Sequence, residues 1–438
     1  MAPVEAVRAL FRRQKWWETL FFLCGVVALA SAFSVAFLGA DSAPYSVKTN
    51  EPLAPVDSPR FAESLSYLVN APIERGGSVE VLDNGDGFLP ALLRDIGAAR
   101  STINILVYVW KDGRMSDQLL DALIARQRQG VAVRVLLDGF GGDKAPDELF
   151  DALVQAGGRV ASYREASLTT WMRVHRRNHR RAIVIDSRVG YVGGMAIGDQ
   201  WLGNAQDEQH WRDMMFRVTG PMARRLQAAF VGPWVSASGE IVVQPAAEPP
   251  VEASGVERFI HHVNSPADDD QSMAYFYLLP ILAARRSISL TTPYFIPDEP
   301  LKAALRERAR AGVEVRLIVP GRHTDHALTR FTGQNAYDTL LEAGVKIYEY
   351  QPTFIHSKVA VVDGQWSIIG SPNLNTRSRR LDEENALAIL DRELAAQLER
   401  RYAADLARSS AIDLGDWRRR SPLLRLVQLS ARLIENQS

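Results

Sequence analysis

Two stretches of the chain share one pattern, HSKVAVVDGQWSIIGSPN at residues 356–373 and HRRAIVIDSRVGYVGGMA at residues 179–196, and the expected fold follows from this repetition. In each, a basic residue stands two positions after the histidine, four residues separate it from an aspartate, and six more lead to a glycine. The residues before the aspartate are small or β-branched, which predicts a strand. The histidine and the basic residue should therefore point to one face, and the glycines let the backbone approach a ligand closely.

The sequence around the two motifs repeats as well. Ala98-Ala99-Arg100 and Ala283-Ala284-Arg285 each precede an apolar stretch, and a helical pattern then ends before GVAVRVLL at 130–137 and GVEVRLIV at 312–319. Strands that alternate with helices of roughly 10–15 residues indicate βαβ units on a buried sheet. We therefore expect an α/β protein with a duplicated domain, whose two mixed, largely parallel sheets are related by pseudo-twofold symmetry.

Composition excludes several classes of protein. The chain has 438 residues, of which 47% are hydrophobic, so it is long enough for two or three domains and is not a disordered or collagenous chain. Its 51 basic and 51 acidic residues give a net charge of zero, which argues against a dedicated nucleic-acid binder. The single cysteine, Cys24, cannot form an intrachain disulfide.

The N-terminal region contains an uncharged apolar segment at residues 19–40. At about 1.5 Å per residue it would span roughly 33 Å, close to the thickness of a bilayer core, so we predict one transmembrane helix. A cleaved signal peptide is an alternative because Ala30-Ser31-Ala32 resembles a cleavage site, and a buried soluble helix is another. Basic residues precede the segment, which predicts a cytoplasmic N-terminus and an exported body; they are Arg8, Arg12, Arg13 and Lys15.

These patterns divide the chain into consecutive segments. Prolines are frequent after the apolar segment, and the stretch QPAAEPPVEAS between the two copies is typical of a linker. Near the C-terminus, Ser421-Pro422 begins a helix with an apolar face and arginines elsewhere, which either lies on a membrane surface or packs against the body. The predicted segments are an anchor (1–40), a tether (41–77), a first half (78–240), a linker (241–256), a second half (257–410) and a basic amphipathic C-terminal helix (411–438).

The paired motifs point to phosphoryl transfer. Histidines at equivalent positions of a repeat could meet at the interface between the halves. One histidine could then attack phosphorus while the other protonates the leaving oxygen, and nearby cations would stabilise the charge on the phosphoryl oxygens. The alternative is that both motifs are only structural.

The two motifs resemble those of the phospholipase D superfamily, and the resemblance covers roughly residues 78–400. It is closest to bacterial cardiolipin synthases in four segments: Arg177–Arg180, Trp211–Asp213, Thr292–Asp298 and Asn373–Ser378. The resemblance implies a transphosphatidylase without metal or other cofactor, which converts phosphatidylglycerol into cardiolipin and glycerol through a phosphatidyl-histidine intermediate. It further implies anionic phospholipid partners, no nucleic acid, and a place in the bacterial cytoplasmic membrane.

The resemblance also assigns candidate site residues. His179 is the expected nucleophile and His356 the general acid and then base, although the two roles could be exchanged. Asp186 and Asp363 complete the catalytic motifs, and we expect them to fix the motif loops rather than carry protons. The groups expected to hold the phosphate or to orient the histidines are Lys358, Arg181, Ser371, Asn373, Gly194, Asp213 and Glu384.

The first motif departs from the family at two positions. Arg181 replaces the expected lysine, and Ala196 replaces an asparagine that would donate a hydrogen bond. Two alternative functions stay open: a hydrolase of the same superfamily that acts on phospholipid or nucleic acid, and a lipid-binding pseudoenzyme, which Arg181 and Ala196 suggest. The sequence indicates neither the acceptor alcohol nor the oligomeric state.

Overall fold

The computed structural model describes residues 25, 47–142, 147–164, 177–243, 255–265, 270–422 and 428. Apart from Gly25, the predicted anchor lies outside these residues, as do most of the linker and most of the C-terminal helix. Within the described parts of the chain, no helix is long and apolar enough to cross a membrane.

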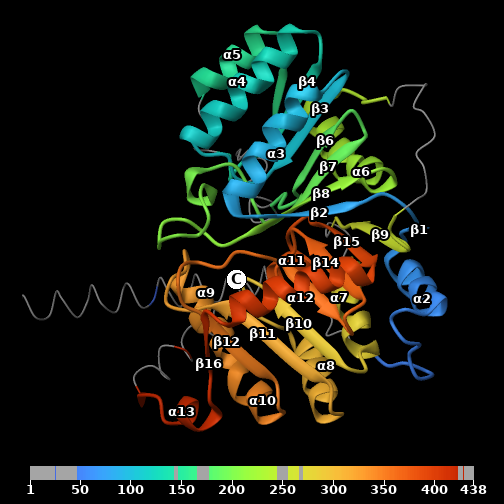
Figure 1. Ribbon diagram of the computed structural model, residues 1–438, viewed down its shortest axis with the longest axis vertical. Helices are drawn as coiled ribbons and strands as arrows, with labels where there is room; N and C mark the ends of the chain where they lie inside the picture. Colours follow the sequence, from blue (N-terminus) through green and yellow to red (C-terminus); the bar gives the residue numbers. More distant parts are fainter. Residues whose placement is uncertain are drawn as a thin grey trace, which may run out of the picture. The chain divides into compact units, whose positions relative to one another are not determined.

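The first half builds one seven-stranded sheet with helices on both faces (Figure 1). The strand order is β2-β8-β7-β6-β3-β4-β5. The bounds are β2 (Val79–Asp83), α3 (Asn84–Ala98), β3 (Thr102–Val107), α4 (Arg114–Arg128), β4 (Ala132–Asp138), α5 (Asp147–Gln155), β5 (Arg159–Tyr163), β6 (Ala182–Ile185), β7 (Val189–Gly193), a 3-10 turn (Asp199–Trp201), β8 (Met214–Thr219) and α6 (Pro221–Ser238).

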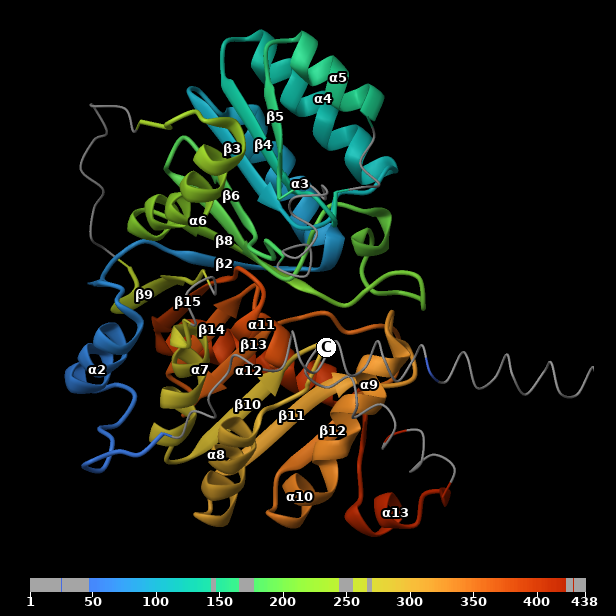
Figure 2. The same cartoon turned by 180° about the vertical axis from the view of Figure 1, so that it is seen from behind.

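The second half builds a nine-stranded sheet in the order β1-β9-β15-β14-β13-β10-β11-β12-β16. Helices α7, α8 and α10 lie on one face and α12 lies on the other (Figures 1 and 2). The bounds are α2 (Pro59–Val69), β1 (Ile73–Glu74), β9 (Arg258–Val263), α7 (Ser272–Ala283), β10 (Ser287–Thr291), α8 (Glu299–Arg310), β11 (Glu314–Pro320), α9 (Ala327–Gly333), a 3-10 turn (Gln334–Ala336), α10 (Tyr337–Glu342), β12 (Lys346–Tyr350), β13 (Val359–Val362), β14 (Trp366–Gly370), α11 (Thr376–Arg380), β15 (Asn385–Leu390), α12 (Arg392–Leu406), β16 (Ser409–Ala411) and α13 (Leu414–Arg418).

The segment predicted as a tether contains folded structure. Helix α2 buries Phe61 and Leu65, and the ring of Phe61 meets Trp366 of β14 edge to face at 5.1 Å. Strand β1 pairs with β9 in antiparallel fashion. Residues 59–74 therefore pack with the second sheet, although they precede the first half in the chain.

Two mixed sheets in a duplicated α/β arrangement confirm the predicted fold class, but the expectation that they are largely parallel is wrong. Among the strands in the described part of the chain, only β3-β4-β5 and β10-β11-β12 pair in parallel; the other neighbouring strands are antiparallel. The reason lies in the motifs, where tight turns begin at Asp186 (φ 52°) and Asp363 (φ 56°). These turns join β6 to β7 and β13 to β14 as antiparallel hairpins. Such a short turn can join only antiparallel strands, and an apolar run has the same sequence pattern in either arrangement.

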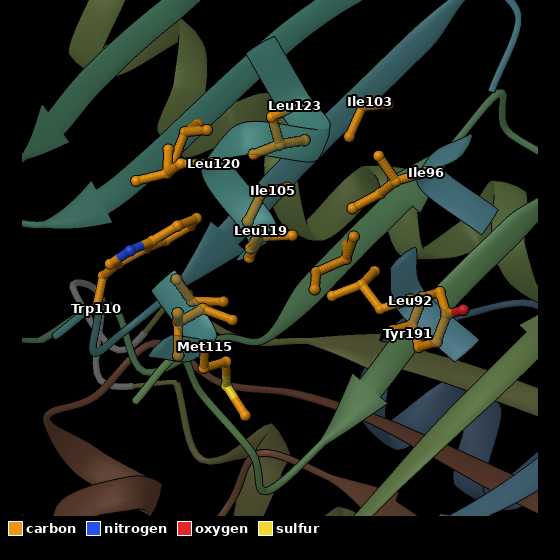
Figure 3. Packing of buried hydrophobic residues seen from close by; sticks show 14 of the residues in the cluster. Leu92, Ile96, Ile103, Ile105, Trp110, Met115, Leu119, Leu120, Leu123 and Tyr191 are labelled. Atoms are coloured by element: carbon orange, nitrogen blue, oxygen red, sulfur yellow. The ribbon is translucent and has the colours of Figure 1, made fainter. Parts of the chain in front are cut away.

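The core of the first half lies between its sheet and helices α3 and α4 (Figure 3). A second hydrophobic cluster is shared by the two halves: Val184, Phe216 and Leu226 from the first pack with Val361, Leu387 and Leu398 from the second. Because both sheets contribute to this cluster, the halves form one packed interface. The histidine motifs lie at this interface.

Candidate active site

Both motif histidines lie at the carboxyl end of a parallel strand. His179 precedes β6, which pairs with β3, and its ring lies 5.1 Å from the ring of Tyr108, the residue after β3. His356 precedes β13, which pairs with β10, and its ring lies 6.3 Å from Tyr294, three residues after β10. The two halves therefore place their histidines in equivalent local positions.

The backbone of each histidine is held by the other half. The amide of His179 donates to the carbonyl of Glu383 at 2.8 Å, and the amide of His356 donates to the carbonyl of Arg212 at 2.7 Å. Isolated parallel bridges join the adjacent residues across the interface. This reciprocal pairing fixes the two histidine segments against each other.

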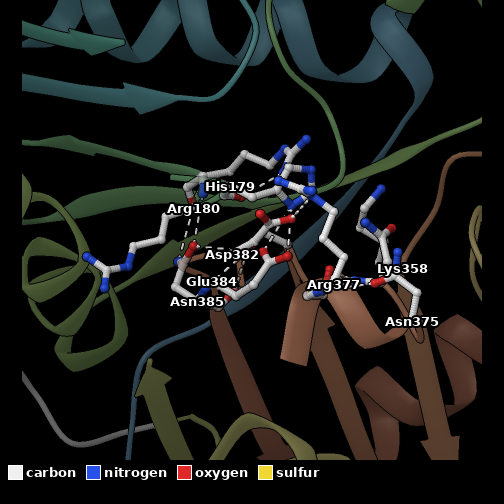
Figure 4. A network of polar contacts seen from close by, with 12 residues as sticks. His179, Arg180, Lys358, Asn375, Arg377, Asp382, Glu384 and Asn385 are labelled. Carbon is white, nitrogen blue, oxygen red and sulfur yellow. Dashed lines mark hydrogen bonds and ion pairs between the residues drawn. The ribbon is translucent and has the colours of Figure 1, made fainter. Parts of the chain in front are cut away.

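The carboxylates that orient the histidines are exchanged between the halves. His179 Nδ1 lies 2.9 Å from Glu384 Oε1, and His356 Nδ1 lies 2.7 Å from Asp213 Oδ2 (Figure 4 shows the His179 side). The Oδ2 atom of Asp213 also accepts from Trp201 Nε1 at 3.0 Å, and Glu384 accepts from the Ser371 hydroxyl at 2.5 Å. Because a carboxylate holds Nδ1 on both rings, Nε2 is the nitrogen on each that can react, and Lys358 Nζ lies 3.1 Å from Nε2 of His356.

Arg181 takes the same local position as Lys358. Lys358 Nζ donates to the carbonyl of His356 at 2.8 Å, and Arg181 Nη1 donates to the carbonyl of His179 at 2.7 Å. Both side chains are buried, and Arg181 Nε has no hydrogen-bond partner among the residues that the structure describes. The arginine thus keeps a cation at the position where the family has lysine.

Burial sets the protonation of the site. Burial lowers the pKa of His179 well below its usual value, and the charge of Arg181 lowers it further. Burial and the charge of Lys358 lower the pKa of His356 to about 4, while the carboxylate of Asp213 acts in the opposite direction. Burial also lowers the pKa of Lys358 to about 7 and raises that of Glu384 to about 7. Both imidazoles are therefore neutral at pH 7 before an anion binds, as a nucleophile requires.

The small residues of the two motifs differ in what they contact. Asn373 is buried, and its Oδ1 has no partner among the described residues. At Gly194, which matches Ser371, a Cβ would come within 2.2 Å of Asp213 Oδ1, so only glycine leaves room for that carboxylate. Ala196, which matches Asn373, is buried in the core of the first half.

The two motif aspartates lie at the far ends of their strands from the histidines. Asp186 accepts from the amides of Arg100, Ser101 and Thr102 at 2.7–2.9 Å. Asp363 does the same with Arg285, Arg286 and Ser287 at 2.7–3.1 Å. Each carboxylate thus ties the motif hairpin to the repeated Ala-Ala-Arg segment.

Several residues of the site were given no role from the sequence, although Trp211, Arg212 and Tyr294 lie in segments that carry the family resemblance. Arg212 binds Asp405 at 2.9 Å and Asp83 at 3.0 Å, which fixes the segment next to Asp213. Asn385 Oδ1 accepts from the amide of Arg181 at 2.9 Å. The ring of His356 is surrounded by aromatic residues at 5.3–6.3 Å: Trp201, Trp211, Tyr294 and Phe354. Except for Phe354, which is two residues from His356, each of these residues lies far along the chain from its partner, so the spacing of residues could not reveal these contacts.

Within the described ranges, no group of three or more histidine, cysteine, aspartate or glutamate side chains is arranged to hold a metal ion. The site instead consists of two histidine–carboxylate pairs with buried cations beside them. A duplicated α/β domain with one histidine motif per copy defines the phospholipase D class of proteins.

Comparison with known proteins identifies the family within this class. The family model described as "Cardiolipin synthase, PLD-like domain" matches residues 92–230 and 278–406. The cardiolipin synthase of Geobacillus kaustophilus (strain HTA426) is 32% identical over 389 residues, which cover 87% of this chain and 76% of that protein. Cardiolipin synthase A of Pseudomonas fluorescens (strain SBW25) is 33% identical over 391 residues, covering 88% and 80%.

A solved structure shares the fold. The phosphatidylserine synthase of Haemophilus influenzae Rd KW20 superimposes with a TM-score of 0.64 at 16% identity, over 86% of this chain and 98% of that one. The chain belongs to the cardiolipin synthase family with a phospholipase D-like domain and is a phosphatidyltransferase whose substrates are phospholipids.

Proposed function

We propose that the protein is a cardiolipin synthase that moves a phosphatidyl group from one phosphatidylglycerol to a hydroxyl of a second and releases glycerol. The observation that carries this proposal is the pair of histidines, each oriented through Nδ1 by a carboxylate of the other half. Two reactive Nε2 atoms at one interface suit an in-line transfer that passes through a covalent intermediate.

In the first step, the Nε2 lone pair of His179 attacks phosphorus. The bond from phosphorus to the headgroup oxygen breaks, and His356 gives its Nε2 proton to that oxygen, so glycerol leaves as a neutral alcohol. The phosphatidyl group is then bound to His179. His356 takes up this Nε2 proton from solvent when the anionic phosphodiester binds and raises its pKa, and Lys358, whose Nζ lies 3.1 Å from His356 Nε2, keeps its own charge.

In the second step, the now neutral His356 takes a proton from a hydroxyl of the second phosphatidylglycerol. The hydroxyl oxygen attacks phosphorus, and the bond to His179 breaks and returns the lone pair to Nε2. Two molecules of phosphatidylglycerol thus give one cardiolipin and one glycerol, and His356 recovers the proton that it gave.

The electrostatic surroundings favour this division of roles. Burial and Arg181 lower the pKa of His179, which keeps its nucleophilic lone pair free. His356 has Asp213 at its Nδ1, and this carboxylate raises the pKa of His356 against the effect of burial. An anionic phosphodiester next to His356 would raise its pKa further, as a general acid needs.

The buried cations would hold the phosphoryl oxygens. Lys358 and Arg181 carry positive charge beside the two histidines, and the unpartnered Nε of Arg181 can donate to an oxygen of the transferred group. Asn373 would add a polar contact from the second half. Ser371 is bonded to Glu384 and would therefore act by orienting His179.

The membrane arrangement is part of the same proposal. Residues 1–40 would carry a single transmembrane helix in the bacterial cytoplasmic membrane, with the N-terminus cytoplasmic and the body outside. In spheroplasts, added protease should then digest the body, and protection of the body would contradict this orientation. For the C-terminal segment, the buried Gln428, whose side chain bonds Gln334 at 2.8 Å, favours packing against the body at that position.

The test uses full-length protein with phosphatidylglycerol that is labelled in the headgroup and in the acyl chains. Cardiolipin and free glycerol in equal amounts, both lost in His356→Ala, would support the proposal. Phosphatidic acid in place of cardiolipin would mean that water is the acceptor and the protein is a hydrolase. If no phospholipid is turned over until Arg181→Lys and Ala196→Asn are introduced, the pseudoenzyme alternative would hold instead.

A further inference from the structure

Two exposed apolar side chains flank the site, one from each half. Phe140 follows β4 and is 55% exposed, and Leu328 stands near the start of α9, after β11, and is 50% exposed. Strands β4 and β11 are the second parallel strands of their halves. Both residues therefore lie at the edge of the sheets where the histidines are.

Phe140 is connected to the His179 side of the site. Its amide donates to Asp138 Oδ1 at 3.0 Å, and Asp138 Oδ2 accepts from the amide of Asn178, the residue before His179, at 2.7 Å. One carboxylate thus joins the loop that carries Phe140 to the loop that carries the nucleophile.

Leu328 is connected in a similar way to the His356 side. The ring of His326 lies 6.2 Å from Tyr294, and the ring of Tyr294 lies 6.3 Å from His356. Tyr294 also donates to Asp325 at 2.5 Å, which holds the β11–α9 loop against the site. The exposed leucine follows this loop directly.

Positive charge accompanies the apolar residues. The guanidinium of Arg177 lies over the ring of Phe140 at 3.8 Å. The side chain of Arg322, at the start of the β11–α9 loop, is 76% exposed and lies 3.8 Å from the exposed carboxylate of Glu208. Exposed apolar side chains next to arginines are typical of surfaces that meet anionic headgroups and the acyl boundary below them. A lipid that presents its phosphate to buried histidines also keeps its acyl chains outside, beside this rim.

We propose that Phe140 and Leu328, here called the apolar rim, insert into the lipid surface so that both halves face one leaflet. Donor and acceptor lipids would then enter from the same surface without a rotation of the body. This inference rests on the proposed function, because a phospholipid substrate is what makes a bilayer the partner. The exposed Tyr67 and Leu68 of α2 lie at the opposite end of the body from α9 (Figures 1 and 2) and are not part of the rim.

The direct test measures depth in the membrane. Full-length protein with Cys24→Ser receives one spin label, through Phe140→Cys, Leu328→Cys or, as a control, Val154→Cys on α5, where the native side chain is also 50% exposed. In vesicles of phosphatidylglycerol and phosphatidylethanolamine, labels at 140 and 328 should collide more with oxygen and less with a water-soluble nickel chelate than the label at 154. Equal accessibility of all three labels to the chelate would overturn the proposal.

A second measurement separates the rim from catalysis. Phe140→Ser combined with Leu328→Ser should lower turnover of vesicle phosphatidylglycerol about tenfold and leave turnover of dispersed short-chain phosphatidylglycerol unchanged, whereas Val154→Ser should affect neither. Equal loss on both substrates would place the two residues in the catalytic site and refute a membrane role. If the wild type turned over no phospholipid, the proposed function would fail. The depth measurement would then still show whether residues 140 and 328 enter the membrane.

Discussion

Replacement of Asp213 by asparagine tests the exchange of carboxylates between the halves. Asp213 Oδ2 lies 2.7 Å from His356 Nδ1, and Asp213 is completely buried, so water does not replace the lost interaction. A hydrogen bond to a charged group contributes about 1.5–3 kcal/mol, which corresponds to a kcat about 10- to 150-fold lower. We expect this loss with phosphatidylglycerol, because His356 must protonate a glycerol oxygen in that reaction.

The assay compares two donors that differ in the leaving group. Glycerol leaves poorly without a proton, whereas the p-nitrophenolate released from phosphatidyl-p-nitrophenol is stable without one and reports the first step by its colour. Asp213→Asn should therefore recover most of its rate with the activated donor. Glu384→Gln, which removes the carboxylate from the nucleophile His179, should stay slow with both donors.

Trp201→Phe is the matched control, because Trp201 Nε1 donates to the same Asp213 oxygen at 3.0 Å and the phenyl ring keeps the packing against His356. It should retain most of the activity with both donors. Recovery of Glu384→Gln in place of Asp213→Asn would show that the histidines have the opposite roles. Equal losses of the two variants with both donors would refute the division of roles itself.

Four further predictions concern single positions. Gly194→Ser should lower kcat more than tenfold, because it forces a Cβ to within 2.2 Å of the Asp213 carboxylate. Ser371→Gly adds no Cβ and should lower kcat less, and steady-state kinetics of both variants check this difference. Asp363→Ala should lower the free energy of unfolding in urea by about 1–3 kcal/mol with little change in kcat, because three backbone amides lose their acceptor, and Asp363→Asn should lose less. Arg181→Lys should stay active because a lysine can reach the carbonyl of His179 as Lys358 reaches that of His356, while Arg181→Met should lose most of its kcat. Burial lowers the pKa of Lys358 to about 7, so kcat/KM should decline above that pH as the cation is lost, and Lys358→Arg should move the decline to higher pH in a pH–rate profile.

The parallel part of each sheet and the duplicated order of elements could be predicted because local signals encode them. Apolar runs, helical periodicity and glycines after helices are properties of neighbouring residues. The antiparallel part could not be predicted in the same way. A buried strand has one apolar pattern whichever direction its neighbour runs, and the direction depends on the turns at Asp186 and Asp363.

The chemical groups of the candidate site can be identified from local sequence patterns alone. Two histidine motifs in a repeat, each with a basic residue, glycines and a downstream carboxylate, indicate phosphoryl transfer without any coordinates. The sequence also shows that Arg181 and Ala196 depart from the family motif, but the effect of these two residues on the site depends on their contacts. The structure supplied one answer: Arg181 Nη1 bonds the carbonyl of His179 as Lys358 Nζ bonds that of His356.

The assignment of each carboxylate to its histidine follows from the folded molecule and not from the order of residues in the chain. In the sequence, Asp213 follows the first motif and Glu384 follows the second, so each would be assigned to its own half. The interface exchanges them, because His179 pairs with the backbone of Glu383 and His356 with that of Arg212. Contacts between residues about 140 to 200 positions apart depend on how the two halves pack. The halves pack through a shared apolar cluster, and no pattern of neighbouring residues shows which apolar side chains will meet in it.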